Sequence, residues 1–280
     1  MGLRITDAVN AIDASPLGPF RSLWRHRALI LEMARREVEM RYRGSFLGVF
    51  WSIITPVLTL LVYTFVFRFV FQVRWGDQPG GTGEFAVVLF AGLIVFWCFA
   101  DAVGRAPSLI LAQGMFVKKV VFPLEALVAV AIVASFFQLA VNTAILLVAS
   151  LVLGGTLSWS MLAFPLILVP FALGLIGICW VLAAAGVYLR DIGQVIQLLV
   201  MLLMFVVPLF YPVSAVPESF RFWIEWNPLG FFITEARNSL LWGIMPDWRA
   251  LALATGGAWV VAWLGYLAFM KARRGFADVI

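Results

Sequence analysis

Long apolar runs, almost free of charge, alternate with short polar segments along this chain. Six runs come close to the roughly 20 residues that a helix needs to cross a bilayer. They cover residues 46–71, 85–103, 124–153, 161–189, 192–211 and 250–270. Only Arg190 and Asp191 separate the fourth run from the fifth, which predicts a hairpin with a very short turn. The pattern therefore predicts an all-α membrane protein in which residues 44–280 form six transmembrane helices.

The segment before the first run has the pattern of an amphipathic helix over residues 20–43. Basic residues repeat at helical steps beside an apolar face that carries aromatic rings. The apolar positions are Phe20, Trp24, Leu31, Ala34, Val38 and Tyr42. A basic amphipathic helix of this kind lies in the membrane interface, although a helix packed on a protein partner would show the same pattern. We expect residues 1–19 to form a flexible cytoplasmic tail.

The segment between the last two runs is too apolar for a solvated loop and too broken for a span. Four prolines interrupt it among many aromatic residues: Pro212, Pro217, Pro228 and Pro246. Backbone that lies at membrane depth without spanning survives only where it is buried or lines a water-filled cavity. The pattern predicts re-entrant half-helices between spans five and six. The rings could form an interface belt or stack on sugar rings, and the composition favours neither.

The overall composition supports a membrane protein with several spans. Of the 280 residues, 63% are hydrophobic and 12% are charged, and the mean hydropathy is +1.00. Soluble domains have roughly 45–50% apolar and about 25% charged residues. So little charge cannot cover a surface in water, which excludes a soluble enzyme, a disordered chain and a coiled coil.

The basic residues gather on one side of the predicted topology. Six spans place both termini on the same side, and that side holds 15 of the 20 Lys and Arg residues. By the positive-inside rule this bias places both termini in the cytoplasm. It also explains the net charge of +5 without a nucleic-acid partner.

The inventory of reactive residues excludes several kinds of site. His26 is the single histidine, and Cys98 and Cys179 lie far apart in apolar runs, so the sequence predicts no zinc, haem or dithiol site. No GxxxxGK[ST] sequence occurs to hold nucleotide phosphates. We therefore predict no catalytic residue, no metal and no cofactor bound by this chain.

Few polar side chains lie in the predicted spans or at their ends. Asp101 and Arg105 stand four residues apart, which favours a local ion pair. Glu125 opens the third span, where the helix dipole stabilises an acid. The deeper polar side chains are the amides of Gln138, Asn142, Gln194 and Gln197. Amides of this kind commonly join helices by hydrogen bonds, and they could also line a route for a polar substrate.

Several short motifs, in order and with matching spacing, resemble one known family. They are REVEMRYRGSFLGVFW at 36–51, FVKKVVFP at 116–123, LRDIG at 189–193, PLFYP at 208–212, WNP at 226–228 and RRGFAD at 273–278. Together they extend over nearly the whole chain. The sequence resembles the membrane subunits of ABC type-2 exporters for polysaccharides and polyol phosphates, such as lipid-linked O-antigen, capsular polysaccharide and teichoic acid.

The resemblance implies a homodimer that works with two copies of a separate cytoplasmic ATPase, which would bind ATP and Mg²⁺. The residues that it assigns to ATPase coupling are Phe116, Val117, Lys118, Lys119, Val120, Arg190 and Asp191. Those that it assigns to an interfacial gating helix are Trp24, Arg36, Glu37, Arg41, Tyr42 and Arg43. Periodicity alone leaves open whether the two lysines contact an ATPase or lipid headgroups.

The implied function is the permease subunit of an ATP-driven exporter that moves a lipid-linked polysaccharide across the bacterial inner membrane. We assign its substrate pathway to Trp51, Tyr63, Tyr211, Phe222, Trp223 and Trp226. An intramembrane glycosyl- or prenyl-transferase is a weaker alternative, because no DxxD or DD pair occurs to hold Mg²⁺. A proton-coupled carrier would need acids deeper in the spans than Asp101. A permease of the same fold for another lipid-like cargo is the third alternative.

Overall fold

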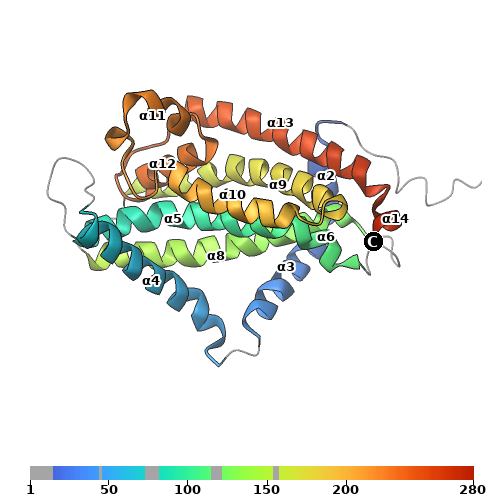
Figure 1. Ribbon diagram of the computed structural model, residues 1–280, viewed down its shortest axis with the longest axis horizontal. Helices are drawn as coiled ribbons and strands as arrows, with labels where there is room; N and C mark the ends of the chain where they lie inside the picture. Colours follow the sequence, from blue (N-terminus) through green and yellow to red (C-terminus); the bar gives the residue numbers. More distant parts are fainter. Residues whose placement is uncertain (1–14, 44–45, 73–81, 115–121, 154–157) are drawn as a thin grey trace, which may run out of the picture.

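The computed structural model describes residues 15–43, 46–72, 82–114, 122–153 and 158–280. Every regular element within these ranges is helical, which confirms the predicted all-α class. Five long helices run side by side along the long axis of the molecule (Figure 1). They are α5 (Thr82–Arg105), α8 (Leu124–Val152), α9 (Phe164–Tyr188), α10 (Ile192–Val206) and α13 (Trp248–Arg273).

Four stretches among the described residues are long and apolar enough to cross a membrane. They are Gly83–Ala112, Leu124–Val152, Trp159–Tyr188 and Trp248–Arg273. The other two predicted spans contain shorter apolar helices, Trp51–Phe67 and Ile192–Val206, so the number of six spans stays a prediction. α10 ends before the predicted limit at residue 211, because Val207 precedes Pro208 and takes an extended backbone with ψ 151°.

Two helices lean away from the bundle and form a V (Figure 1). They are α3 (Arg27–Tyr42) and α4 (Trp51–Thr64); α4 follows the 3₁₀ turn η1 (Gly48–Phe50) and continues into the π-helical turn η2 (Phe65–Val70). The helix predicted over residues 20–43 is divided into α2 (Gly18–Arg25) and α3. The division falls at His26, whose backbone leaves the helical region with φ −101° and ψ 12°.

The segment between α10 and α13 contains short helices rather than a span. They are η5 (Val213–Ala215), α11 (Glu218–Glu225) and α12 (Pro228–Leu240). Asn227 caps α12, because its side-chain oxygen accepts a hydrogen bond from the Leu229 backbone at 3.0 Å. Short helices therefore lie where half-helices were predicted, while their depth in the membrane stays a prediction.

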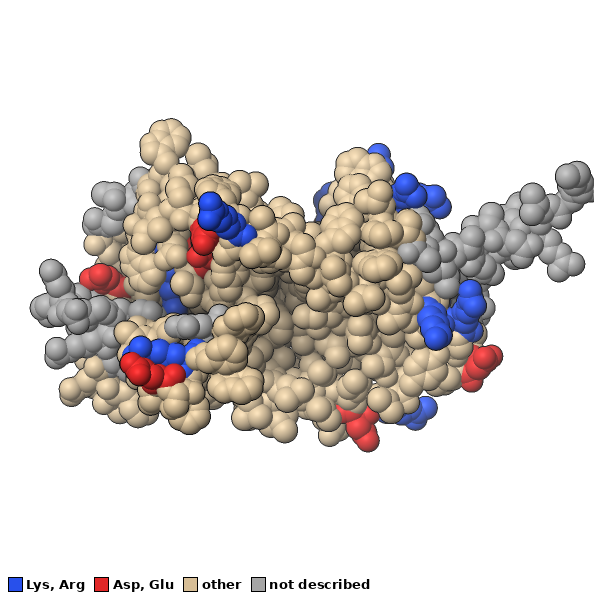
Figure 2. All heavy atoms as spheres, turned by 90° about the horizontal axis from the view of Figure 1, so that it is seen from above, with Lys and Arg blue, Asp and Glu red and all other residues tan. Residues whose placement is uncertain are grey.

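Charged side chains gather near the two ends of the long axis (Figure 2). The face shown has a broad band between these ends without Lys, Arg, Asp or Glu, as a chain surrounded by hydrocarbon requires. The α11 end carries α11 and α12, and the α14 end carries α2 and α14 (Phe276–Val279) (Figure 1). The remaining short helices are η3 (Ala106–Ser108), α6 (Leu109–Ala112) and η4 (Trp159–Ala163).

The α9 and α13 helices approach each other closely through glycines. A Cβ atom at Gly265 would meet the backbone of Gly177, and a Cβ atom at Gly177 would lie 2.7 Å from the Cα atom of Ala262. Small residues let the backbones of membrane helices pack in this way. This contact makes α13 part of the bundle, although few of its residues are buried.

Candidate functional site

A cluster of charged side chains joins α3, α5 and α8. Arg41 and Arg105 each place a guanidinium nitrogen 3.0 Å from the same carboxylate oxygen of Asp101, and Arg105 also pairs with Glu37. Ser135 donates to that oxygen at 2.6 Å. The four charged side chains are between 23% and 32% exposed. The predicted pair of Asp101 and Arg105 is thus confirmed, within a charge-balanced cluster that holds α3 to two of the long helices.

Hydrogen-bonded amides continue this cluster into the bundle. The hydroxyl of Tyr42 donates to Gln138 Oε1 at 2.8 Å, and burial raises the pKa of this phenol, so it stays protonated at neutral pH. The Nε2 atom of Gln138 donates to the Ser52 carbonyl at 2.9 Å and to Asn142 Oδ1 at 3.0 Å. The chain of contacts ties the end of α3 and the start of α4 to α8.

The same residues line a cavity of about 390 Å³. It is bounded by α3, α4, α5 and α8, and Trp51, Thr55 and Thr59 line it from α4. Arg41 and Tyr42 belong to the predicted gating helix, whereas Trp51 belongs to the predicted substrate pathway, so the structure brings members of both groups into one site.

Glu37 belongs to the charged cluster, whereas the other three predicted gating residues, Trp24, Arg36 and Arg43, lie on the surface. Trp24 is exposed and packs on Phe20, with 5.9 Å between the ring centroids, and the guanidinium of Arg27 lies 4.9 Å from its centroid. Arg36 pairs with Glu32 at 3.0 Å on the exposed side of α3. Arg43 is exposed at the end of the helix.

Of the apolar positions predicted over residues 20–43, Ala34 is buried against the bundle, whereas Phe20, Trp24 and Leu31 are exposed. Rings and aliphatic side chains exposed beside basic residues are what an interfacial helix presents to lipid. This exposure is consistent with the interface assignment, which stays a prediction.

A second polar cluster lies near the α14 end, and sequence reasoning missed it. Glu125 is buried in the first turn of α8 and pairs with Arg273 of α13 at 2.9 Å. Ser22 of α2 donates to the other oxygen of Glu125 at 2.9 Å, and Arg273 also donates to the Phe122 carbonyl at 3.0 Å. The indole of Trp180 in α9 donates to the Glu125 carbonyl at 3.1 Å. Glu125 and its backbone therefore join α8 to three other helices, α2, α9 and α13.

The predicted ATPase-coupling residues are divided between two places. Residues 116–120 lie outside the described residues. Arg190 and Asp191 are exposed in the turn between α9 and α10, as the hairpin prediction requires. The Glu125 cluster begins directly after the coupling segment, at Phe122.

Two residues of the predicted substrate pathway pack around the end of α10. Tyr63 meets Phe210 edge-on, with 5.5 Å between the ring centroids. The Tyr211 hydroxyl donates to the Phe205 carbonyl at 2.8 Å, which caps the last turn of α10. Tyr63 and Tyr211 therefore each make a contact that holds the segment at the end of α10.

Three further pathway residues form an aromatic group around α11. Trp223 and Trp226 are 70% and 75% exposed, and the ring of Phe222 lies 5.8 Å and 5.4 Å from theirs. Trp51 lies in the cavity beside α3 instead. The six predicted residues therefore form three separate groups in one subunit.

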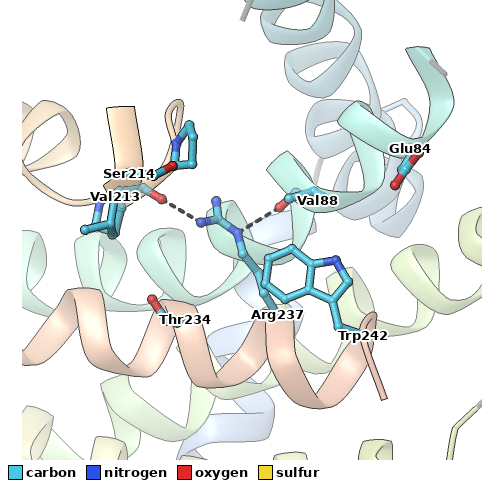
Figure 3. Close-up of a pocket in the computed structure, with 9 residues that line it drawn as sticks. Glu84, Val88, Val213, Ser214, Thr234, Arg237 and Trp242 are labelled. Atoms are coloured by element: carbon cyan, nitrogen blue, oxygen red, sulfur yellow. Dashed lines mark hydrogen bonds between the residues drawn. The ribbon is translucent and has the colours of Figure 1, made fainter. Parts of the chain in front are cut away.

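Arg237 of α12 is a buried cation at the α11 end, and only 2% of its surface is exposed. It donates to the carbonyl groups of Val88, Pro208 and Leu209 at 3.0, 2.6 and 2.9 Å. Figure 3 shows its guanidinium in a cavity of about 390 Å³, between α5 and the segment after α10. Gly92 faces the guanidinium, and a Cβ atom there would lie 3.0 Å from Cζ. No side-chain pattern foretold this site, because its acceptors are backbone carbonyls.

Within the described ranges, no three His, Cys, Asp or Glu side chains come together as a possible metal site. The polar sites found are instead hydrogen-bonding and ion-pairing groups placed between helices.

Comparison with known proteins gives a consistent result. The family model described as "ABC-2 type transporter" matches residues 28–241. The O-antigen export system permease protein RfbA of Myxococcus xanthus is 28% identical over 262 residues, which cover 93% of this chain and 98% of the relative. The protein of the same name from Klebsiella pneumoniae is 24% identical over 90% of this chain and 95% of its own length.

A further relative is the polysialic acid transport protein KpsM of Escherichia coli. It is 25% identical over 201 residues, which cover 68% of this chain and 74% of the relative. The family model covers most of the chain, including nearly all of α3, the charged cluster and Arg237. This chain belongs to the ABC-2 type transporter family.

Proposed function

We propose that this chain is the permease subunit of an ABC exporter that carries a lipid-linked polysaccharide across the bacterial inner membrane. The observation that supports this function most is the similarity over nearly the full length of both chains to O-antigen export permeases. The fold supports it further, because long apolar helices are joined to a helix pair with exposed aromatic residues. Under this proposal the α14 end faces the cytoplasm and the α11 end faces outward.

The energy for transport would come from partner subunits. The sequence has no phosphate-binding loop of its own, so two cytoplasmic ATPase subunits would bind ATP and Mg²⁺ beside a homodimer of this chain. Residues 116–120 and the turn at Arg190 and Asp191 would contact them. These assignments follow from the family and from the position of the turn at the end of the bundle.

The Glu125 cluster offers a path for motion from the ATPase into the membrane. Phe122 and Glu125 follow the coupling segment directly, and their contacts lead to Arg273 in α13 and Ser22 in α2. A displacement of the coupling segment would therefore move the interfacial helices together with the last span. The charged cluster around Asp101 would transmit that motion to α5 and α8, next to the cavity.

Deletion of the gene in its own host tests the proposal. We expect the surface polysaccharide to disappear and its lipid-linked precursor to accumulate inside the cell, with both restored by the wild-type gene. The purified chain should also bring down a P-loop ATPase encoded in the same host. Normal surface polysaccharide in the deletion strain would reject this function, whereas loss of another exported lipid would favour the alternative cargo.

A further inference from the structure

Two polar stripes line the cavity bounded by α3, α4, α5 and α8. One stripe lies on α8 and the other on α4, and in each the residues follow one another at steps of three and four. They are Ser135, Gln138 and Asn142 on α8, and Ser52, Thr55 and Thr59 on α4. This spacing places the members of each stripe on one side of their helix. Polar groups thus extend from the charged cluster to the middle of α8, a predicted span.

Asn142 has a donor that the protein does not use. The residue is 2% exposed, and its Oδ1 atom accepts from Gln138. Its Nδ2 atom makes no hydrogen bond among the described residues, and Asn142 lines the cavity. A donor at the wall of a cavity binds water, or an acceptor of a ligand that displaces this water. The cavity can therefore receive a hydrogen-bond acceptor at Asn142.

The rest of the lining indicates which acceptor fits. Positive and negative charges balance within the cluster at the cavity mouth, and Asp101 would repel an anion. The rest of the lining combines hydroxyl and amide groups, the indoles of Trp51 and Trp97, and the apolar side chains of Pro56, Cys98 and Leu139. A hydrocarbon chain would leave Asn142 without a partner, whereas a sugar ring offers oxygen atoms and a flat apolar face. The volume of about 390 Å³ lies within the range of roughly 300–1,000 Å³ for small-ligand sites.

We propose that this cavity binds one uncharged sugar ring of the exported glycan, with Asn142 donating to a sugar oxygen. The inference rests on the function proposed above and adds a binding site within a single subunit. Its position beside Arg41 and Tyr42 places the bound sugar next to the interfacial helix, where a lipid-linked glycan would first meet the protein.

Site-directed photo-crosslinking tests whether sugar enters the cavity. A benzophenone amino acid at Thr55, in the complete transporter of the host cell, should capture glycan that has been metabolically labelled with a tritiated sugar. The control is the same probe at Leu58, which lies on the same helix, is exposed and does not line the cavity. Absence of label at Thr55, or equal label at both positions, would overturn the subsite. If T55C reacts with a small water-soluble thiol reagent but the photoprobe captures no glycan, the cavity holds water only.

A matched pair of substitutions tests the role of Asn142. N142L keeps the size of the side chain and removes both the donor and the acceptor for Gln138, whose Nε2 atom keeps its hydrogen bond to the Ser52 carbonyl. Export should fall about 2- to 10-fold, the value of one hydrogen bond. A lower export per assembled transporter supports the donor, whereas a loss of export in proportion to a loss of assembled transporter would assign Asn142 to packing alone. T143V is the control, because the Thr143 hydroxyl donates to Leu139 in its own helix at 2.8 Å. Wild-type export by N142L would contradict the assignment.

The two failures can be told apart. If the wild-type gene itself does not restore surface glycan to the deletion strain, the proposed function fails. If the wild-type gene restores it and neither test detects a sugar in the cavity, only the subsite fails.

Discussion

Arg237 shows how a single buried charge can hold a broken segment in place. It donates to carbonyl groups on α5 and on the segment after α10, where the prolines prevent a regular helix. Carbonyls that leave a helix ladder need new donors. A planar guanidinium supplies several donors at once. Arg237 therefore donates hydrogen bonds to the free carbonyl groups of the segment that interrupts the bundle.

The contact between Arg237 and Gly92 gives a prediction for a double-mutant cycle. G92A should destabilise the protein, because the new Cβ atom would displace the guanidinium from its carbonyl partners. In an R237A background the same Gly92 change should cost little, so the two effects should be non-additive by about 1–3 kcal/mol. Thermal unfolding of the purified protein, followed by tryptophan fluorescence, measures each effect.

The control for this cycle is G174A, because a Cβ atom at Gly174 would lie 3.7 Å from its nearest neighbour, an ordinary contact. Additive effects of G92A and R237A would show that Gly92 does not act through the arginine.

Single residues divide into those that sequence reasoning could place and those that it could not. The pair of Asp101 and Arg105 was predictable, since residues four apart meet on a helix. The partners of Glu125 were not, because Ser22 and Arg273 lie more than 100 positions away in either direction. Local spacing determines helical neighbours, whereas a contact between helices depends on how the whole bundle packs.

At the scale of elements, the packing of α13 on α9 depends on Gly265, which has no side chain. Gly265 has backbone of α9 where a Cβ atom would lie, whereas Gly256 on the same helix has nothing within 4 Å. Gly265 therefore has no room for a larger residue, whereas Gly256 has, although the sequence alone does not distinguish them.

We predict opposite signs for two alanine substitutions on α13. G265A should destabilise the protein, because the helices must separate, by an amount typical of overpacking, about 1–3 kcal/mol. G256A should be neutral or stabilising by about 0.5–1 kcal/mol, as expected for alanine in an exposed helix. Thermal unfolding of the two variants side by side measures the difference, and equal effects would argue against close packing at Gly265.

The aromatic group of α11 gives a second prediction at this scale. Replacing Trp223 and Trp226 with Ala should lower glycan export while ATPase activity without glycan and dimer assembly persist, if these rings stack on sugar as the glycan leaves. F220A is the matched control, since Phe220 is exposed on the same helix. Full export by the double variant, with a lower unfolding temperature, would instead identify the rings as a membrane-interface belt.

The elements were predictable where their pattern was long and regular. The limits of α8 and α13 lie within a few residues of the predicted spans. Shorter elements differed for local reasons: Pro208 stops α10, and the backbone at His26 divides the amphipathic segment. The length of a hydrophobic run shows how many residues are apolar, but it does not show where a helix within the run begins or ends.

The orientation of the whole molecule can be measured with engineered cysteines. The native Cys98 and Cys179 are buried, so they give little background. In intact cells with an accessible outer face of the membrane, an impermeant maleimide should label I244C at the α11 end. It should label R190C only after permeabilisation. The reverse pattern would show that the topology is inverted and would contradict the orientation predicted from the positive-inside rule.

Coupling between subunits gives the second prediction at the scale of the whole molecule. Reversing the charge of Lys118 and Lys119 together should abolish export while the chain still inserts into the membrane, because the reversal would disrupt contact with the ATPase. The same double change should reduce recovery of the ATPase with the purified chain. Full export by this variant would assign the two lysines to lipid headgroups instead.

The Arg237 site also has a consequence for biogenesis. Val88, Pro208 and Leu209 all precede Arg237 in the chain, so they leave the ribosome before their common donor. A nascent chain that stops short of α12 therefore leaves the Pro208 and Leu209 carbonyl groups, which lie outside a helix, without this donor at the point where α5 meets the segment after α10. Arg237 is synthesised after its acceptors and forms the hydrogen bonds that hold this junction. Chains truncated before residue 237 should therefore be recognised and degraded by membrane proteases.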